Sequence, residues 1–119
     1  MNWIAVFVGG GLGSLCRFGI AQLGKELNWE LPWATFISNI AACLLLAVVS
    51  IQLNQKMGDQ SFWTALLIVG FCGGFSTFST YSFETAMLIK SGHWPWAIGN
   101  VLISTISGLA IIWYILWQK

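Results

Sequence analysis

Residues 70–84 read Gly-Phe-Cys-Gly-Gly-Phe-Ser-Thr-Phe-Ser-Thr-Tyr-Ser-Phe-Glu, which places two adjacent glycines, five Ser and Thr hydroxyls and a carboxylate inside an apolar chain. Of the 119 residues, 57% are hydrophobic and only 8% are charged. This composition is typical of a protein in lipid, where an unpaired polar group costs roughly 2–7 kcal/mol. We therefore expect this stretch to line a water-filled or ion-filled path, or to be buried in protein against one.

The chain has four apolar segments, at residues 3–24, 32–54, 62–90 and 95–117, and the polar stretch lies within the third. Because a helix needs about 20 residues to cross the hydrocarbon layer, the sequence predicts an all-α membrane protein with four transmembrane helices in one domain, 1–119. The third helix would be about 43 Å long if straight, so its centre is predicted to be unwound. The eight tryptophans all lie near predicted helix ends, as indoles at headgroup depth do.

The basic residues are balanced across the predicted membrane. Lys56 and Lys119 fall on one side, Lys25 and Lys90 on the other, and Arg17 lies within the first span. Orientation in a membrane follows Lys and Arg asymmetry, which is almost absent here. Either another signal decides insertion, or the chain inserts both ways, so that an antiparallel pair can form.

The sequence holds no sign of an enzyme. It contains no carboxylate pair, phosphate-binding loop, nucleophile–base set or metal-ligand cluster, and no basic patch for nucleic acid. His93 is predicted to be a solvated loop residue, and the three cysteines, Cys16, Cys43 and Cys72, to be small packing residues.

Small residues predict close helix contacts at two places. Gly9 and Gly13 form a Gly-x-x-x-Gly pair, for which packing within the chain is the favoured interpretation. Gly70 and Gly74 form a second pair, which overlaps the polar stretch and makes a contact between subunits plausible.

Two further polar residues lie within predicted helices. Asn39 is in the middle of the second span, where an amide forms a helix–helix hydrogen bond or contributes to a solute path; by itself the structural role is favoured. Arg17 is expected to anchor the first helix, by reaching the interface or by pairing with Glu26 or Glu84.

Within the polar stretch, the adjacent glycines and the competing hydroxyls predict an unwound turn near residues 73–77. An unwound turn exposes carbonyls that can hold a cation, and the helix N-terminus that follows favours anions. Phe78 and Tyr81 share one face of that helix, and their positive ring edges suit a small anion. Lipid-facing aromatic side chains are the more common alternative.

Three motifs together resemble the Fluc (CrcB) family of bacterial fluoride channels over essentially the whole chain. They are Gly-Gly-Gly-Leu-Gly at 9–13 followed by Arg17-Phe18, the set Pro32, Thr35 and Asn39, and above all residues 70–84. The last is close to the family signature Gly-Phe-x-Gly-Gly-x-Thr-Thr-Phe-Ser-Thr-Phe-Ser-x-Glu and is highly specific.

The resemblance implies an antiparallel, dual-topology homodimer with two pores that passively export fluoride across the bacterial inner membrane. It implies that Phe78 and Tyr81 form a ring pair and that Asn39 is a pore amide. Backbone carbonyls of Gly73 and Ser76 would hold a structural sodium ion on the dimer axis. Further pore residues implied by the resemblance are Thr35, Thr80, Glu84 and Ser104.

The sequence departs from the family pattern at three positions. Tyr81 replaces the usual Phe and adds a hydroxyl that would narrow the pore or bind fluoride, while Ser76 replaces Thr. Asn100 stands where many relatives carry Tyr. A heterodimer with a paralogue therefore remains an alternative to the homodimer.

Two other functions fit four short spans. A small multidrug-type antiporter needs a mid-membrane carboxylate, expected in its first helix, whereas here Glu84 lies in the third. A non-conducting membrane subunit would use the polar stretch only for packing.

Overall fold

A computed structural model of the chain describes residues 2–55 and 60–118. Its helices are α1 (Asn2–Glu26), α2 (Trp33–Gln55), α3 (Gln60–Trp63), the π-helix η1 (Thr64–Cys72), α4 (Gly73–Phe75), α5 (Phe78–Lys90) and α6 (Trp94–Trp117). Counting Gln60–Lys90 as one bent helix, four helices in this part of the chain are long and apolar enough to cross a membrane. This confirms the predicted all-α class and four spans. Lys56, Asp59 and Lys119 lie outside the described residues.

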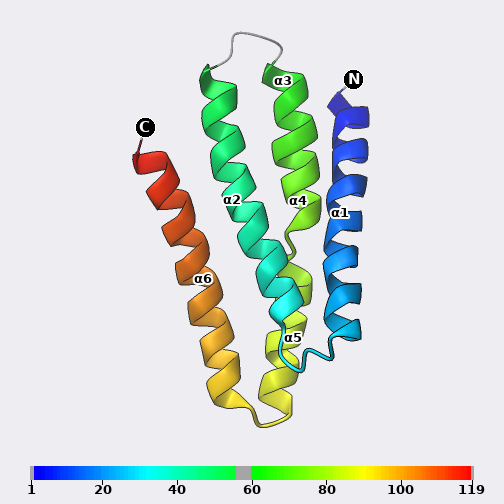
Figure 1. The fold of residues 1–119 in the computed structure, drawn as a ribbon, viewed down its shortest axis with the longest axis vertical. Coiled ribbons are helices and arrows are strands. Elements are labelled where there is room, and N and C mark those ends of the chain that lie inside the picture. The colour runs from blue at the N-terminus through cyan, green and yellow to red at the C-terminus, as the bar shows by residue number, and fades with distance from the viewer. Residues whose placement is uncertain (1, 56–59, 119) are drawn as a thin grey trace.

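The helices run alternately up and down, with both termini at one end of the molecule and the loops at 27–32 and 91–93 at the other (Figure 1). The long axis is 52 Å. Helix α1 packs along η1 and α4, and α6 packs on α2 and α5 at the other side. The broken third span therefore lies between the first helix and the other two.

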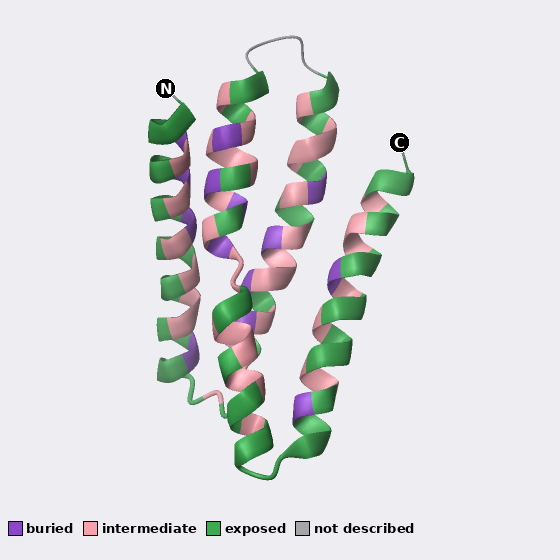
Figure 2. Cartoon of the chain, turned by 180° about the vertical axis from the view of Figure 1, so that it is seen from behind, coloured by how far each residue is buried: buried purple, intermediate pink, exposed green. Residues whose placement is uncertain are grey.

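Apart from Phe75, the buried residues, purple in Figure 2, are small, and most of the large apolar side chains are exposed. Buried positions include Ala5, Ala42, Ala47, Ala65 and Ala97. In water this pattern would be inverted, but in lipid the tails solvate large apolar side chains and small residues let helix backbones approach. The exposed surface is thus the surface of a membrane protein.

Both described loops leave their helices through the same cap. After α1, Asn28 adopts a positive φ of 56°, and the N–H of Trp29 bonds to the Gly24 carbonyl at 2.9 Å. After α5, Gly92 has φ of 81°, and the N–H of His93 bonds to the Leu88 carbonyl at 2.8 Å. These are Schellman motifs, in which the left-handed residue lets the chain satisfy its last carbonyls.

The two Gly-x-x-x-Gly pairs face each other within the chain. A Cβ at Gly74 would collide with the backbone of Gly10, and a Cβ at Gly9 or Gly13 would collide with a carbonyl of η1. The intrachain interpretation of the first pair is confirmed. Gly70 and Gly74 also pack against α1 within the chain, and a contact between subunits at this pair stays a prediction.

The third span is broken at two residues. Ser76 has φ −78° and ψ 159°, and Thr77 has φ −152° and ψ 123°, so both are extended. The predicted break is confirmed, but its predicted start at Gly73 is wrong, since Gly73 and Gly74 remain helical in α4. At the break, the Asn39 amide takes the N–H of Thr77 and the Thr77 hydroxyl takes the N–H of Thr80, so side chains replace the helical partners of the backbone.

Candidate pore and polar cavity

Asn39 on α2 holds the break through both ends of its amide. The N–H of Thr77 donates to Asn39 Oδ1 at 2.7 Å, and Asn39 Nδ2 donates to the Thr77 carbonyl at 3.2 Å. A side-chain amide thus replaces the helical partners of an extended residue inside the membrane, where unpaired groups are costly. The helix–helix interpretation of Asn39 is confirmed, with a backbone as its partner.

The same exchange frees the two carbonyls expected to hold a cation. In a continuous helix, the Thr77 N–H would bond to the Gly73 carbonyl and the Thr80 N–H to the Ser76 carbonyl. Here the first donates to Asn39, and the second donates to Thr77 Oγ1 at 3.3 Å, as Thr77 caps α5. The carbonyl oxygens of Gly73 and Ser76 are therefore released from the helical ladder.

A third carbonyl at this helix end is already occupied. Arg17 on α1 donates through Nε to the Gly74 carbonyl at 3.1 Å, and Ser14 Oγ lies 3.5 Å from the same oxygen. A cation at a helix C-terminus also interacts favourably with the helix dipole. Arg17 thus anchors α1 as predicted, but through a carbonyl and not through Glu26 or Glu84.

Glu84 on α5 is linked to α2 by a hydroxyl. Thr35 Oγ1 donates to Glu84 Oε1 at 2.8 Å, and Thr35 is buried. The second carboxylate oxygen, Oε2, is buried and has no hydrogen-bond partner among residues 2–55 and 60–118. A buried oxygen of this kind is costly unless a further partner reaches it.

A cavity of about 650 Å³ lies between α1, α2 and the broken span. Its polar lining consists of Ser14, Arg17, Lys25, Thr35, Ser38, Thr77, Thr80 and Glu84. Two of these side chains are basic, one is acidic, and the others are hydroxyls. We call this space the polar cavity; the cationic side chains of Arg17 and Lys25 suit an anion or water, whereas the hydroxyls of Thr35 and Ser38 already donate to protein acceptors. A second cavity of about 390 Å³ shares Glu84 and extends toward Glu30 and Ser91.

The predicted ring pair lies outside the polar cavity. The rings of Phe78 and Tyr81 are 6.0 Å apart and tilted by 40°, so the expected contact on one helix face is present. Phe78 is 80% exposed in the single chain. The hydroxyl of Tyr81 forms no hydrogen bond with any residue that the structure describes. Within one chain, the ring of Phe78 is therefore uncovered and the hydroxyl of Tyr81 has no hydrogen-bond partner among the described residues.

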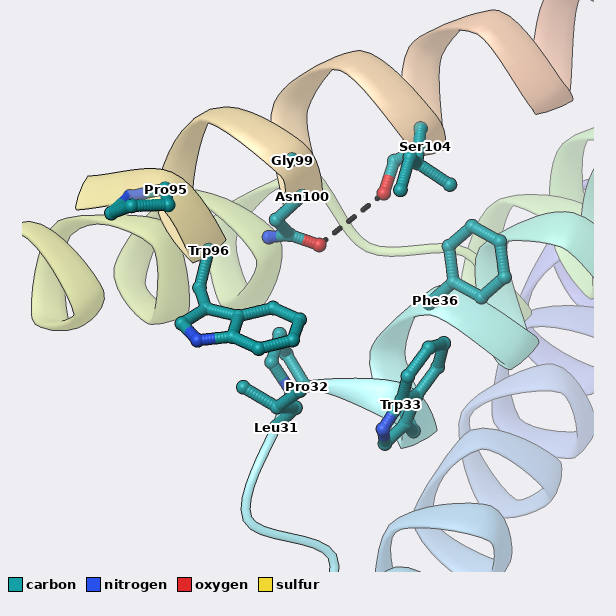
Figure 3. A pocket seen from close by; sticks show the side chains of 10 residues that line it. Leu31, Pro32, Trp33, Phe36, Pro95, Trp96, Gly99, Asn100 and Ser104 are labelled. Atoms are coloured by element: carbon teal, nitrogen blue, oxygen red, sulfur yellow. Dashed lines mark hydrogen bonds between the residues drawn. The ribbon is translucent and has the colours of Figure 1, made fainter. Parts of the chain in front are cut away.

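A second polar group links α5 to α6. Asn100 Nδ2 donates to Thr85 Oγ1 at 2.9 Å, and Ser104 Oγ donates to Asn100 Oδ1 at 3.4 Å. Asn100 and Ser104 line a groove of about 270 Å³ between the starts of α2 and α6, shown in Figure 3. The rest of its lining is apolar or aromatic.

The predicted site residues therefore form separate groups in one chain. Thr35, Thr80 and Glu84 share the polar cavity, while Ser104 lies in the groove. Cavity residues that the sequence analysis missed are Ser14, Lys25, Ser38 and Thr77. Positions 14, 17, 21 and 25 on α1 are separated by three, four and four residues, so they share one face of the helix. This spacing in the sequence would have predicted the side of the cavity that holds Arg17 and Lys25.

A family model described as "CrcB-like protein, Camphor Resistance (CrcB)" matches residues 4–115. The chain belongs to the CrcB family. One relative, from Coxiella burnetii (strain Dugway 5J108-111), is 37% identical over 115 residues, which cover 95% of this chain and 93% of the relative. Another, from Salmonella arizonae, is 32% identical over 114 residues, covering 96% and 90%. Both relatives are named fluoride-specific ion channel FluC.

The CrcB match spans all four membrane helices and both sides of the break. The matched region therefore contains the residues of the polar cavity, the groove and the Asn39–Thr77 pair. The chain is a multi-pass membrane protein, and the relatives named above are bacterial proteins.

Proposed function

We propose that this CrcB-family protein is a fluoride-specific ion channel that lowers cytoplasmic fluoride by passive export, and that it is not an enzyme. The polar cavity carries the proposal, because it places the cationic side chains of Arg17 and Lys25 among polar groups in a membrane-spanning chain. Rings of donors and cations are how pores stabilise anions away from water. The names of the bacterial relatives support fluoride as the ion.

We further propose that two copies form an antiparallel homodimer with two pores. The supporting observation is that the candidate pore groups are incomplete in one chain: Phe78 is exposed, and the Tyr81 hydroxyl has no partner among the described residues. A second copy would cover them and close a path beside Asn39, Thr80 and Ser104. The balanced Lys residues agree with insertion in both orientations. The alternative is a heterodimer, in which a paralogue takes the place of the second copy.

We propose a structural sodium ion at the break, held by the carbonyls of Gly73 and Ser76. The residues fit this ion, because both oxygens are released from helical bonding and hard cations take oxygen ligands. One chain offers two such carbonyls, whereas hard cations gather about six ligands. A site on the axis between two copies would double the number. The ion would hold the two breaks together electrostatically.

Fluoride efflux from liposomes that contain only the purified protein tests the channel. A passive channel gives efflux that follows the fluoride gradient and does not change when a proton gradient is imposed. Proton-dependent exchange of a cation would instead identify an antiporter. No flux from well-folded protein would identify a non-conducting subunit, and adding candidate paralogues would then test the heterodimer.

A further inference from the structure

Asn100 on α6 is the centre of a short chain of hydrogen bonds that ends on the backbone of α5. Its amide nitrogen donates to Thr85 Oγ1 at 2.9 Å, and Thr85 Oγ1 donates to the Tyr81 carbonyl at 2.8 Å. On the other side, Ser104 Oγ donates to Asn100 Oδ1 at 3.4 Å. Asn100 therefore has one contact toward α5 and another toward Ser104.

The direction of these bonds is determined by the number of hydrogens. A threonine hydroxyl has one hydrogen, and that of Thr85 is used on the Tyr81 carbonyl, so its oxygen accepts. Asn100 must then present its nitrogen to Thr85, which turns Oδ1 toward Ser104. In this arrangement, the single hydrogen of Ser104 points at Asn100.

This hydrogen bond is weak and lies at the edge of the groove. At 3.4 Å it is longer than most O–H···O bonds, which are 2.5–3.0 Å. Figure 3 shows Asn100 and Ser104 side by side above the groove between α2 and α6. An anion that reaches Ser104 would need the same hydrogen, since a hydroxyl has no other to donate.

We propose that Asn100 is a positioning residue that competes with the transported anion for the hydroxyl hydrogen of Ser104. The inference rests on the proposed fluoride channel and on Ser104 as one of its contacts. When no anion is near, Ser104 donates to Asn100; when fluoride arrives, the hydroxyl rotates to it. Asn100 thereby weakens fluoride binding at Ser104 and favours release, which conduction through a pore requires.

The test is a double-mutant cycle on fluoride efflux. Asn100→Leu keeps the branched shape of the side chain but removes the competing acceptor. In the otherwise unchanged protein, we expect the half-saturating fluoride concentration to fall by roughly threefold, the effect of about one modest hydrogen bond. In a Ser104→Ala background, the same substitution should change this concentration little, because Asn100 acts through the hydroxyl.

The matched control is Thr85→Ser, which removes only a methyl group and keeps the hydroxyl that accepts from Asn100 Nδ2, so that Oδ1 still faces Ser104. We expect it to leave the half-saturating concentration unchanged. The inference is overturned if Thr85→Ser has the same effect as Asn100→Leu, if Asn100→Leu has no effect, or if its effect is the same in the Ser104→Ala background. Each of these results would indicate a purely structural link between α5 and α6.

A readout without flux separates this inference from the proposed function. In protein labelled with ¹⁵N-asparagine, the side-chain signals of Asn100 are identified by their loss in Asn100→Leu. Fluoride should shift them saturably in the unchanged protein but not in Ser104→Ala. If efflux is absent while this shift occurs, the channel proposal fails, but the competition between Asn100 and fluoride for the Ser104 hydroxyl stands. If fluoride causes no shift that depends on Ser104, the inference fails even where efflux is normal.

Discussion

The amide of Asn39 pairs with the backbone of Thr77 at both its oxygen and its nitrogen, at 2.7 and 3.2 Å, across 38 residues of sequence. This one contact holds the second helix against the break of the third. It also removes the Thr77 N–H from the helical ladder, which releases the Gly73 carbonyl. The proposed pore and the proposed sodium site therefore depend on the same side chain.

Asn39→Asp should abolish most fluoride flux. The carboxylate can still accept from the Thr77 N–H, but it cannot donate, and it faces the Thr77 carbonyl with like polarity. We expect flux to fall by about tenfold or more. This is the effect of losing one hydrogen bond away from water and placing a negative charge against a carbonyl oxygen. Liposome efflux measures this. Ser50→Ala on the same helix is the control, and unchanged flux in Asn39→Asp would contradict the assignment.

Phe78→Ile should reduce flux sharply while leaving assembly intact. Phe78 is 80% exposed in one chain and is proposed to face the pore of the dimer. Phe7 on α1 is 82% exposed and provides a matched control, because Phe7→Ile removes the same ring from a position proposed to face lipid. Efflux and size-exclusion profiles of both variants are compared. Equal flux in the two variants would argue that Phe78 also faces lipid.

Gly74→Ala should prevent the close packing of α1 on α4. Its Cβ would collide with the backbone of Gly10, which cannot move aside as a flexible side chain can. We expect a loss of stability of about 1–3 kcal/mol or failure to fold. Gly11→Ala is the control, since its Cβ meets nothing within 4 Å and replacing a helical glycine gains about 0.5–1 kcal/mol. Thermal unfolding in detergent compares them; equal melting temperatures would refute this packing.

Thr35→Val should destabilise the chain through Glu84. Valine has the shape of threonine, but it leaves Glu84 Oε1 as unpartnered as Oε2. The expected cost is about 1–3 kcal/mol, that of a buried acceptor without a donor. In a Glu84→Leu background, the same change should cost much less, because no carboxylate remains. The four variants are compared by thermal unfolding, and additive effects would show that the pair is not coupled.

Removing sodium should reduce flux if the Gly73 and Ser76 carbonyls hold that ion. Replacing Na⁺ with N-methyl-D-glucamine on both sides of the membrane is expected to lower efflux and reduce dimer stability. Thr77→Val should weaken the response to sodium, because without the cap the Thr80 N–H is free to return to the Ser76 carbonyl. The control is Thr105→Val on α6. Efflux that is the same with and without sodium would exclude the ion.

Some of the site was predictable because its signals are local. The hydroxyls at 76–80 compete with the helix wherever they occur, so a break in the third span follows from their presence. Its position at Ser76 and Thr77, however, depends on Asn39 and on the capping hydroxyl, which the sequence separates. The sequence predicts an unwound turn at Gly73 and Gly74, but both are helical and Gly74 admits the backbone of α1. A glycine that unwinds a helix and one that admits a neighbouring backbone look the same in sequence.

By itself, the sequence determined the environment and the outline of this protein. Long apolar runs, tryptophans at their ends and few charges are sufficient for four membrane helices, since the bilayer acts on composition and length alone. Only the tertiary structure decided which polar groups meet. Arg17 meets the Gly74 carbonyl, Glu84 meets Thr35 and Asn39 meets Thr77, each from a different helix. Hydrogen bonds act over about 3 Å, so they depend on how helices pack, which periodicity does not specify.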